Sequence, residues 1–177
     1  YGLSDIAVDR VLSRTPSLLI TCDCGSSDHE RLERLKKHGV DTVVIDHHLV
    51  PEERLPAVAF LNPRRPDCAF PYKHLASCGL ALSLAAGLRA KLSPGLDVRQ
   101  WLDLVAVGTV ADMVPLDGDN RALVRAGMRV LEQGNRYAPI CVDCHGSHNI
   151  TSPNEPRTKI AEMCSKCHMS VYTTYAT

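Results

Sequence analysis

Apolar and polar positions along the first 135 residues predict strands that alternate with helices. Residues 17–21 and 42–45 are short apolar runs of the length of buried strands. Between them, residues 28–38 place charged and apolar side chains at a helical period, and Gly39 follows as the residue expected just beyond a helix. Further helices are predicted at 4–13, 75–91, 98–105 and 121–133. Such alternation is typical of βαβ units, so the predicted fold class is α/β with a parallel sheet.

The pattern changes twice along the chain. Residues 51–71 are rich in proline, which predicts a loop with one edge strand at 57–61. Beyond residue 135 the apolar periodicity stops, and about 40 residues cannot bury much of a core without a cofactor. We therefore predict two parts: an α/β domain over 1–135, and a small, irregular, cofactor-dependent tail over 138–177.

Composition narrows the function classes only slightly. The 177 residues carry 20 basic and 20 acidic side chains, so no net positive charge favours a polyanion, and a nucleic-acid role must rest on motifs. The longest mostly apolar stretch, 75–88, is shorter than the roughly 20 residues of a membrane span, and no transmembrane helix is predicted. No export signal is visible at Tyr1. Four scattered cysteines are predicted to be buried thiols: Cys22, Cys24, Cys68 and Cys78.

Acids and imidazoles follow the apolar runs. Asp46, His47 and His48 come directly after the strand at 42–45, while Asp23 and Asp112 end two other apolar runs. The carboxyl ends of parallel strands are where open α/β sheets bind their ligands. Carboxylates with one or two imidazoles suit a divalent metal used in phosphoryl transfer. The alternative is that each aspartate only caps a following helix or turn.

A series of short motifs follows in a fixed order along the chain. The motifs are Tyr1-Gly-Leu-Ser4, Ile20-Thr-Cys-Asp-Cys-Gly25, Ile45-Asp-His-His48, Asn62-Pro63, Ala76-Ser-Cys-Gly79 and Gly108-Thr-Val-Ala-Asp-Met-Val-Pro-Leu116, followed by Asn120-Arg121. This series resembles the DHH-family phosphoesterases, most closely their RecJ-type, single-strand-specific 5′ exonucleases. The resemblance covers residues 1–135, and the order of the motifs is more specific than any one tripeptide.

This resemblance implies a cytoplasmic hydrolase of DNA repair and recombination that uses Mn²⁺ or Mg²⁺ to degrade single-stranded DNA or short oligonucleotides from 5′ to 3′. By the same resemblance, Asp23 matches a carboxylate that bridges two ions, and His47 and Asp112 match metal ligands. His48 matches a residue that contacts the scissile phosphate, and Asp46 one that orients the histidines. The family's first aspartate-rich motif is expected upstream of Tyr1, so we expect a partial domain whose activity as it stands is doubtful.

The tail carries two Cys-x-x-Cys-His units, the attachment pattern of c-type haem. It resembles multihaem c-type cytochromes, which are periplasmic and pass electrons to a redox partner. A four-thiolate zinc site is the alternative, but zinc has no need of the two histidines, so haem is favoured. His148 is a candidate sixth iron ligand. The haem-binding residues would be Cys141, Cys144, His145, Cys164, Cys167 and His168.

The two parts imply different compartments. The simplest interpretation is a chimeric reading frame joined near residues 134–138, with the phosphoesterase function as the primary prediction. A multihaem electron-transfer protein and a cytosolic hydrolase with a zinc-binding tail remain as alternatives.

Overall fold

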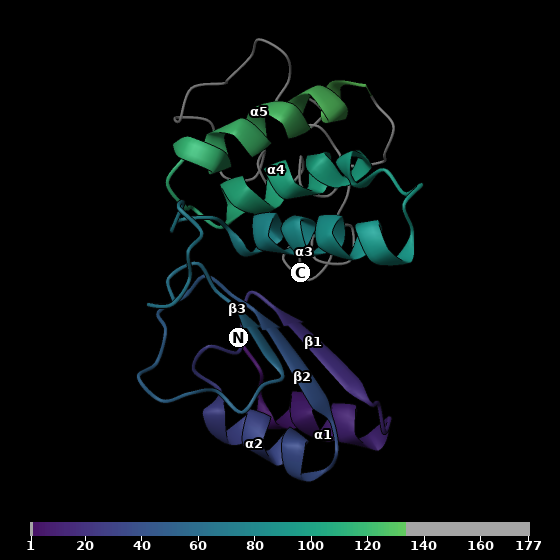
Figure 1. The fold of residues 1–177 in the computed structure, drawn as a ribbon, viewed down its shortest axis with the longest axis vertical. Helices are drawn as coiled ribbons and strands as arrows, with labels where there is room; N and C mark the ends of the chain where they lie inside the picture. Colours follow the sequence, from purple (N-terminus) through teal and green to yellow (C-terminus); the bar gives the residue numbers. More distant parts are fainter. Residues whose placement is uncertain (1, 134–177) are drawn as a thin grey trace, which may run out of the picture. The chain divides into compact units, whose positions relative to one another are not determined.

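The structure, a computed structural model, describes residues 2–133. The chain divides between Val130 and Leu131 into two units, and the fold described below is that of the first. Its sheet has three parallel strands in the order β1 (Leu18–Cys22), β2 (Asp41–Ile45) and β3 (Ala59–Leu61) (Figure 1). Because the strands run in the same direction, their carboxyl ends meet at one edge. The α/β fold class with a parallel sheet is confirmed.

The central strand sends alternate side chains into two different cores, as the period of a strand requires. Val44 packs into a cluster formed with α1 (Asp5–Ser13) and α2 (His29–Lys37), which contribute Val8, Leu32 and Leu35. The neighbouring Ile45 packs instead against Leu80. The central strand is therefore fixed from both faces of the sheet.

Three helices follow the strands: α3 (Ser77–Leu92), α4 (Leu102–Ala111) and α5 (Gly118–Glu132). Helix α3 contacts β1 and β2, and it also packs on α4. A short 3₁₀ turn, η1 (Val98–Trp101), leads into α4. Helices α4 and α5 approach each other at Gly127, where a Cβ atom would lie 2.1 Å from the carbonyl oxygen of Leu102. Only glycine allows this contact.

Local sequence signals account for several element ends. The Ser4 hydroxyl accepts a hydrogen bond of 3.2 Å from the Ala7 N–H and so caps α1. Helix α2 ends at Lys37, and Gly39 adopts a φ of +77° just beyond it, as the sequence predicts. The strand predicted at 57–61 forms only over its last three residues, where β3 pairs with β2 at the sheet edge.

The prediction of a strand-like setting for Asp112 is wrong. The apolar run before it forms helix α4, and Asp112 is the residue that caps the carboxyl end of that helix. The helix predicted at 98–105 correspondingly begins as a 3₁₀ turn and continues to Ala111. The run is apolar on all sides and has no period that separates helix from strand. The packing accounts for the helical conformation of the run, because Val105, Ala106 and Thr109 are buried at helical spacing.

The prediction that the four scattered cysteines are buried is also wrong. Cys22 is exposed, while Cys24, Cys68 and Cys78 are partly exposed. Cys22 and Cys24 flank Asp23 at the end of the edge strand β1, where no further strand of the described chain pairs beside them.

Among residues 2–133 no helix combines the length and the apolar character that crossing a membrane requires. The candidate haem-binding residues of the tail lie outside the described residues.

Candidate metal centre

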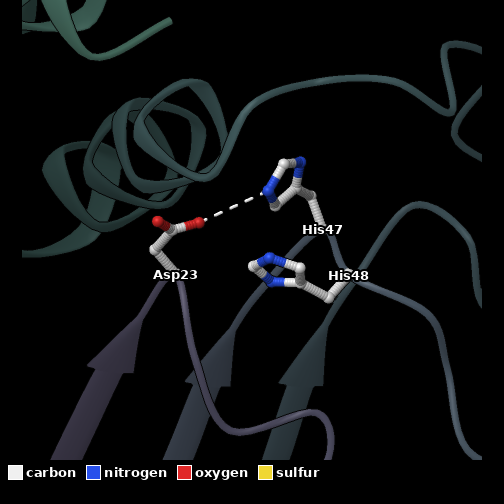
Figure 2. A group of neighbouring side chains, drawn as sticks. All are labelled: Asp23, His47 and His48. Carbon is white, nitrogen blue, oxygen red and sulfur yellow. Dashed lines mark ion pairs between the residues drawn. The ribbon is translucent and has the colours of Figure 1, made fainter. Parts of the chain in front are cut away.

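Three elements bring an acid or an imidazole to the carboxyl-end edge of the sheet. Asp23 directly follows β1, His47 lies just beyond β2, and Asp112 ends α4. His47 Nε2 lies 3.4 Å from Asp23 Oδ1 and 3.3 Å from Asp112 Oδ2. Figure 2 shows the carboxylate of Asp23 and the imidazole of His47 facing each other. The structure thus brings together the three side chains predicted as metal ligands, with the imidazole between the two acids.

The imidazole of His47 is buried and lacks hydrogen bonds. The residue is only 8% exposed, and neither ring nitrogen has a hydrogen-bond partner within the described part of the chain. A buried polar group without a partner costs about 1–3 kcal/mol. A cation held between this imidazole and the two carboxylates would be bound by the ring nitrogen and the acidic oxygens together. The site therefore fits a divalent metal on its own chemistry.

His48 belongs to the group of side chains whose possible metal-ligand atoms lie closest together. One ligand atom each from Asp23, His47 and His48 lies within 4.8 Å of the others, whereas Asp112 approaches the group through His47. The His47 and His48 rings meet edge to face, with centroids 4.6 Å apart. Two carboxylates and two imidazoles are donors suited to Mn²⁺ or Mg²⁺, with the nitrogen ligands favouring the transition metal. His48 can therefore reach either a metal or a group bound to it.

Asp46 is buried and oriented entirely by hydrogen bonds. Its Oδ2 accepts from the Ser26 N–H at 3.0 Å, and its Oδ1 accepts from the His47 N–H at 2.8 Å. Oδ1 also lies 2.6 Å from Nδ1 of His48. Burial raises the pKa of Asp46, but hydrogen bonds from Ser26, His48 and His47 outweigh burial and hold the pKa below its ordinary value.

The pKa of His48 shifts in the opposite direction to that of Asp46. The hydrogen bond to Asp46 is the main cause that raises the pKa of His48 above 6.5. Because Nδ1 binds Asp46, only Nε2 is left to meet a ligand, and the side chain is 57% exposed. Asp46 therefore fixes the ring orientation of His48 and favours its protonated form.

Asn62 completes this arrangement, although no role was predicted for it from the sequence. It follows β3 and is 3% exposed. Its Nδ2 donates to the carbonyl oxygen of His48 at 2.9 Å and reaches Ser26 Oγ at 3.5 Å. The signal was available, since Asn62 is the polar residue directly after the third strand, the same position that identified Asp23 and Asp46.

The backbone is strained beside both acidic groups. Asp23 has a φ of +64°, and Met113, which follows Asp112, has a φ of +57°. Residues other than glycine seldom adopt this left-handed region, and such strain concentrates at functional sites. Gly25 also has a positive φ, and a Cβ atom there would come within 2.9 Å of Val44 Cγ1. The turn after β1 is thus pressed closely against β2.

The two thiols that flank Asp23 are not among the gathered donor atoms, which come from Asp23, His47 and His48. Partial burial, and after it the charge of Asp23, raises the pKa of Cys22. Partial burial and several nearby carboxylates, with Asp46 the largest of these, raise the pKa of Cys24. Within the described chain the donors that lie within reach of one another are therefore oxygen and nitrogen atoms.

Comparisons with known proteins agree with this geometry. Residues 3–109 match the DHH family, N-terminal domain, and residues 133–172 match the doubled CXXCH motif. The single-stranded-DNA-specific exonuclease RecJ of Dickeya dadantii is 43% identical over 145 residues, which cover 76% of this chain and 25% of the relative. The RecJ of Bacillus subtilis is 38% identical over 137 residues, covering 77% and 17%. The chain thus spans about a quarter or less of the length of these relatives.

Solved structures give the same result. A crystal structure of exonuclease RecJ bound to manganese matches with a TM-score of 0.55 and 34% identity, covering 73% of this chain and 32% of that one. RecJ from Thermus thermophilus in complex with Mn²⁺ matches with a TM-score of 0.59 and 36% identity, covering 69% and 18%. Because the family match spans residues 3–109, which is more than half of its length, the chain belongs to the DHH family.

Proposed function

We propose that the α/β part, residues 1–135, is a portion of a metal-dependent phosphodiesterase of the RecJ type that removes nucleotides from the 5′ end of single-stranded DNA. The observation that carries the proposal is the buried imidazole of His47, which makes no hydrogen bond and whose Nε2 lies within 3.4 Å of two carboxylates. The manganese named for two matched structures and the substrate named for the relatives support it.

In this proposal Asp23, His47 and Asp112 hold Mn²⁺ or Mg²⁺. A bound ion of this kind supplies Lewis acidity and lowers the pKa of a water that can serve as nucleophile. The chain's own contribution is to exclude solvent from His47 and to keep two carboxylates close to its Nε2. The negative charges of the two carboxylates offset the charge of one divalent ion, so the ion and its ligands together carry little net charge.

His48 binds the scissile phosphate in this proposal. Asp46 holds Nδ1 and raises the pKa of the ring, so that Nε2 carries a proton over a wider pH range than in a free histidine. A protonated imidazole donates a charge-assisted hydrogen bond to a phosphate oxygen and offsets the charge that builds up there. The net charge of the chain is zero, so this local cation supplies an attraction that the overall composition does not.

Metal binding tests the proposal directly. We expect the full chain to bind Mn²⁺ in a titration followed by electron paramagnetic resonance, and the double variant Asp23→Ala, Asp112→Ala to lose that binding. The matched control is Asp5→Ala, Asp9→Ala, which also removes two carboxylates, but from surface ion pairs on α1 with Arg31 and Arg34. Equal Mn²⁺ binding by all three proteins would refute the assignment of the centre.

A second candidate function concerns the tail. We propose that residues 138–177 attach two c-type haems through Cys141, Cys144, Cys164 and Cys167, with His145 and His168 as axial ligands and His148 as a candidate sixth ligand. Both Cys-x-x-Cys-His units fall within the stretch that matches the doubled CXXCH motif, which supports haem over zinc.

An optical spectrum distinguishes haem from zinc in the tail. Protein produced together with haem-maturation machinery should carry covalent haem that survives acid extraction. The variant in which Cys141, Cys144, Cys164 and Cys167 are all replaced by alanine should lose it, because no thiol is then left to form a thioether bond to a haem vinyl group. Stoichiometric zinc and no covalent haem in the parent protein would decide for the alternative.

A further inference from the structure

Asn120, in the first turn of α5, is a fully buried amide that binds backbone groups of two other segments. Its Nδ2 donates to the carbonyl oxygen of His74 at 2.7 Å and to that of Pro115 at 3.0 Å. Its Oδ1 accepts from the Ala76 N–H at 3.2 Å. One side chain thus joins the segment that leads into α3 to the loop that leads out of α4.

Tyr72 makes a second connection between the same two segments. Its hydroxyl donates to Asp117 Oδ1 at 2.5 Å and lies 3.2 Å from the carbonyl oxygen of Asp117. Its ring covers Gly118, where a Cβ atom would come within 2.6 Å of Tyr72 Cε2. The loop over residues 113–117 is therefore held by a phenol as well as by the amide of Asn120.

Each of the two joined segments leads to a different part of the metal centre. The loop begins immediately after Asp112, whose Oδ2 lies 3.3 Å from His47 Nε2. The other segment leads into Leu75 and α3, which pack against Ile45. Ile45 is the last residue of β2 and is followed directly by Asp46 and His47. Asn120 is therefore a direct connection between the backbone that carries Asp112 and the body that carries His47.

We propose that Asn120 is a positioning residue for the metal centre, which sets the separation of Asp112 and His47 by tying these two backbone segments together. The inference rests on the proposed metal site and assigns a role to a residue that does not touch it. The three contacts need two N–H donors and one oxygen acceptor on a single short side chain. Aspartate has the acceptor but not the donors, and alanine has neither. Partners beyond the direct ligands typically change metal affinity by about 10–100-fold when they are replaced.

The test is Mn²⁺ affinity of the folded protein, measured by electron paramagnetic resonance at a temperature where circular dichroism shows each variant to be folded. We expect Asn120→Asp, which keeps the size and the acceptor but loses both donors, to bind Mn²⁺ about tenfold more weakly. Tyr72→Phe keeps the ring on Gly118 and loses the bonds to Asp117, so about threefold weaker binding is expected. This second variant keeps the test decisive where Asn120→Asp fails to fold.

The control is Leu35→Ala, which opens a cavity in the core cluster formed with α1 and α2 and destabilises the chain without touching the two joined segments. It should bind Mn²⁺ like the parent. Parent-like affinity in folded Asn120→Asp and Tyr72→Phe would overturn the positioning role, even though the proposed function stands. A parent protein that does not bind Mn²⁺ would overturn the proposed function, and the positioning role with it.

Discussion

Two kinds of buried polar side chain lie around the metal centre, and they differ in how completely they are hydrogen-bonded. Asp46, Asn62 and Asn120, which we call the bracing row, are at most 3% exposed and bonded to backbone groups from several segments. His47 is nearly as buried, at 8% exposed, yet neither ring nitrogen makes a hydrogen bond in the described chain, and Nε2 only faces the carboxylates of Asp23 and Asp112. Burial alone therefore does not separate structural from ligand-binding residues; what sets His47 apart is a buried ring without a hydrogen bond that faces two carboxylates.

The largest change in stability should come from replacing a residue of the bracing row. Asp46→Ala leaves the buried N–H groups of Ser26 and His47 without their acceptor, so we expect the free energy of unfolding to fall by about 3 kcal/mol. Urea denaturation of the metal-free protein measures it. Asp67→Ala, which removes an exposed carboxylate paired with Arg65, should leave the unfolding free energy close to that of the parent, because solvent screens this surface ion pair. Equal losses would erase the distinction between bracing residues and the rest of the polar surface.

His47→Leu should behave in the opposite way. Mn²⁺ affinity should fall at least about 100-fold, because a direct ligand is lost. The stability of the metal-free protein should nevertheless change by less than about 1 kcal/mol, since the buried imidazole makes no hydrogen bond and only its contacts with Asp23 and Asp112 are lost. Calorimetric titration and urea denaturation measure the two quantities. A loss of stability similar to that of Asp46→Ala would mean that His47 belongs to the bracing row.

The pair of Asp46 and His48 connects the bracing row to the metal centre and predicts a pH window. The folded protein lowers the pKa of Asp46 and raises that of His48. The contribution of Asp46 is present above its ordinary pKa and is lost as pH falls through the lowered value. The contribution of His48 is present below its ordinary pKa and is lost as pH rises through the raised value. The pair therefore stabilises the metal-free protein most in mildly acidic solution.

Nuclear magnetic resonance titration of the His48 ring checks this window. Asp46→Asn should return the pKa of His48 toward 6.5, since the main cause of its elevation is removed. Asp67→Asn, which removes a carboxylate bonded to Arg65 and not to His48, should leave the titration unchanged. A His48 that titrates identically in all three proteins would show that Asp46 orients the ring without favouring its charge.

The smallest effect tests whether an unpaired group always marks a ligand site. Thr42 is 2% exposed, and its hydroxyl has no hydrogen-bond partner among the described residues, yet it lies on β2 away from the carboxyl end. Thr42→Val should stabilise the protein by about 1 kcal/mol and leave Mn²⁺ affinity unchanged. Thermal unfolding measures the stability of the variant, and the metal titration measures its Mn²⁺ affinity. Weaker Mn²⁺ binding would connect the Thr42 hydroxyl to the metal centre.

Most of the sheet and the first two helices could be predicted from the sequence because their signals are local. Apolar runs of strand length, the cap at Ser4 and the glycine at position 39 act within a few residues of the elements they define. Only the beginning of helix α4 could be predicted, within the helix expected at 98–105, since the rest of the run is apolar on every side. Its conformation depends on close contacts at Gly108 with Cys78 and at Gly127 with Leu102, which are visible only once the helices pack.

The residues of the candidate site also fall into those that local sequence signals predict and those that only packing brings together. Adjacent parallel strands place Asp23 and His47 together, so their proximity follows from the order of elements. Asp112 reaches the site from the end of a helix, which the apolar pattern did not indicate. Asn120 binds Ala76 and His74, which are 44 and 46 positions away along the chain. No local pattern connects residues so distant, and the motif that contains Asn120 predicts a family without predicting this contact.

The left-handed backbone at Asp23 also limits how this position can change over generations. At a φ of +64° glycine is tolerated best and asparagine and aspartate come next, while glutamate and other residues with longer or branched side chains meet a conformational cost of about 1–2 kcal/mol. Asparagine and glycine are each one base change away from an aspartate codon, and neither is negatively charged. A lineage can therefore silence this carboxylate in a single step and keep the fold, whereas exchanging it for another acid is penalised by the backbone itself.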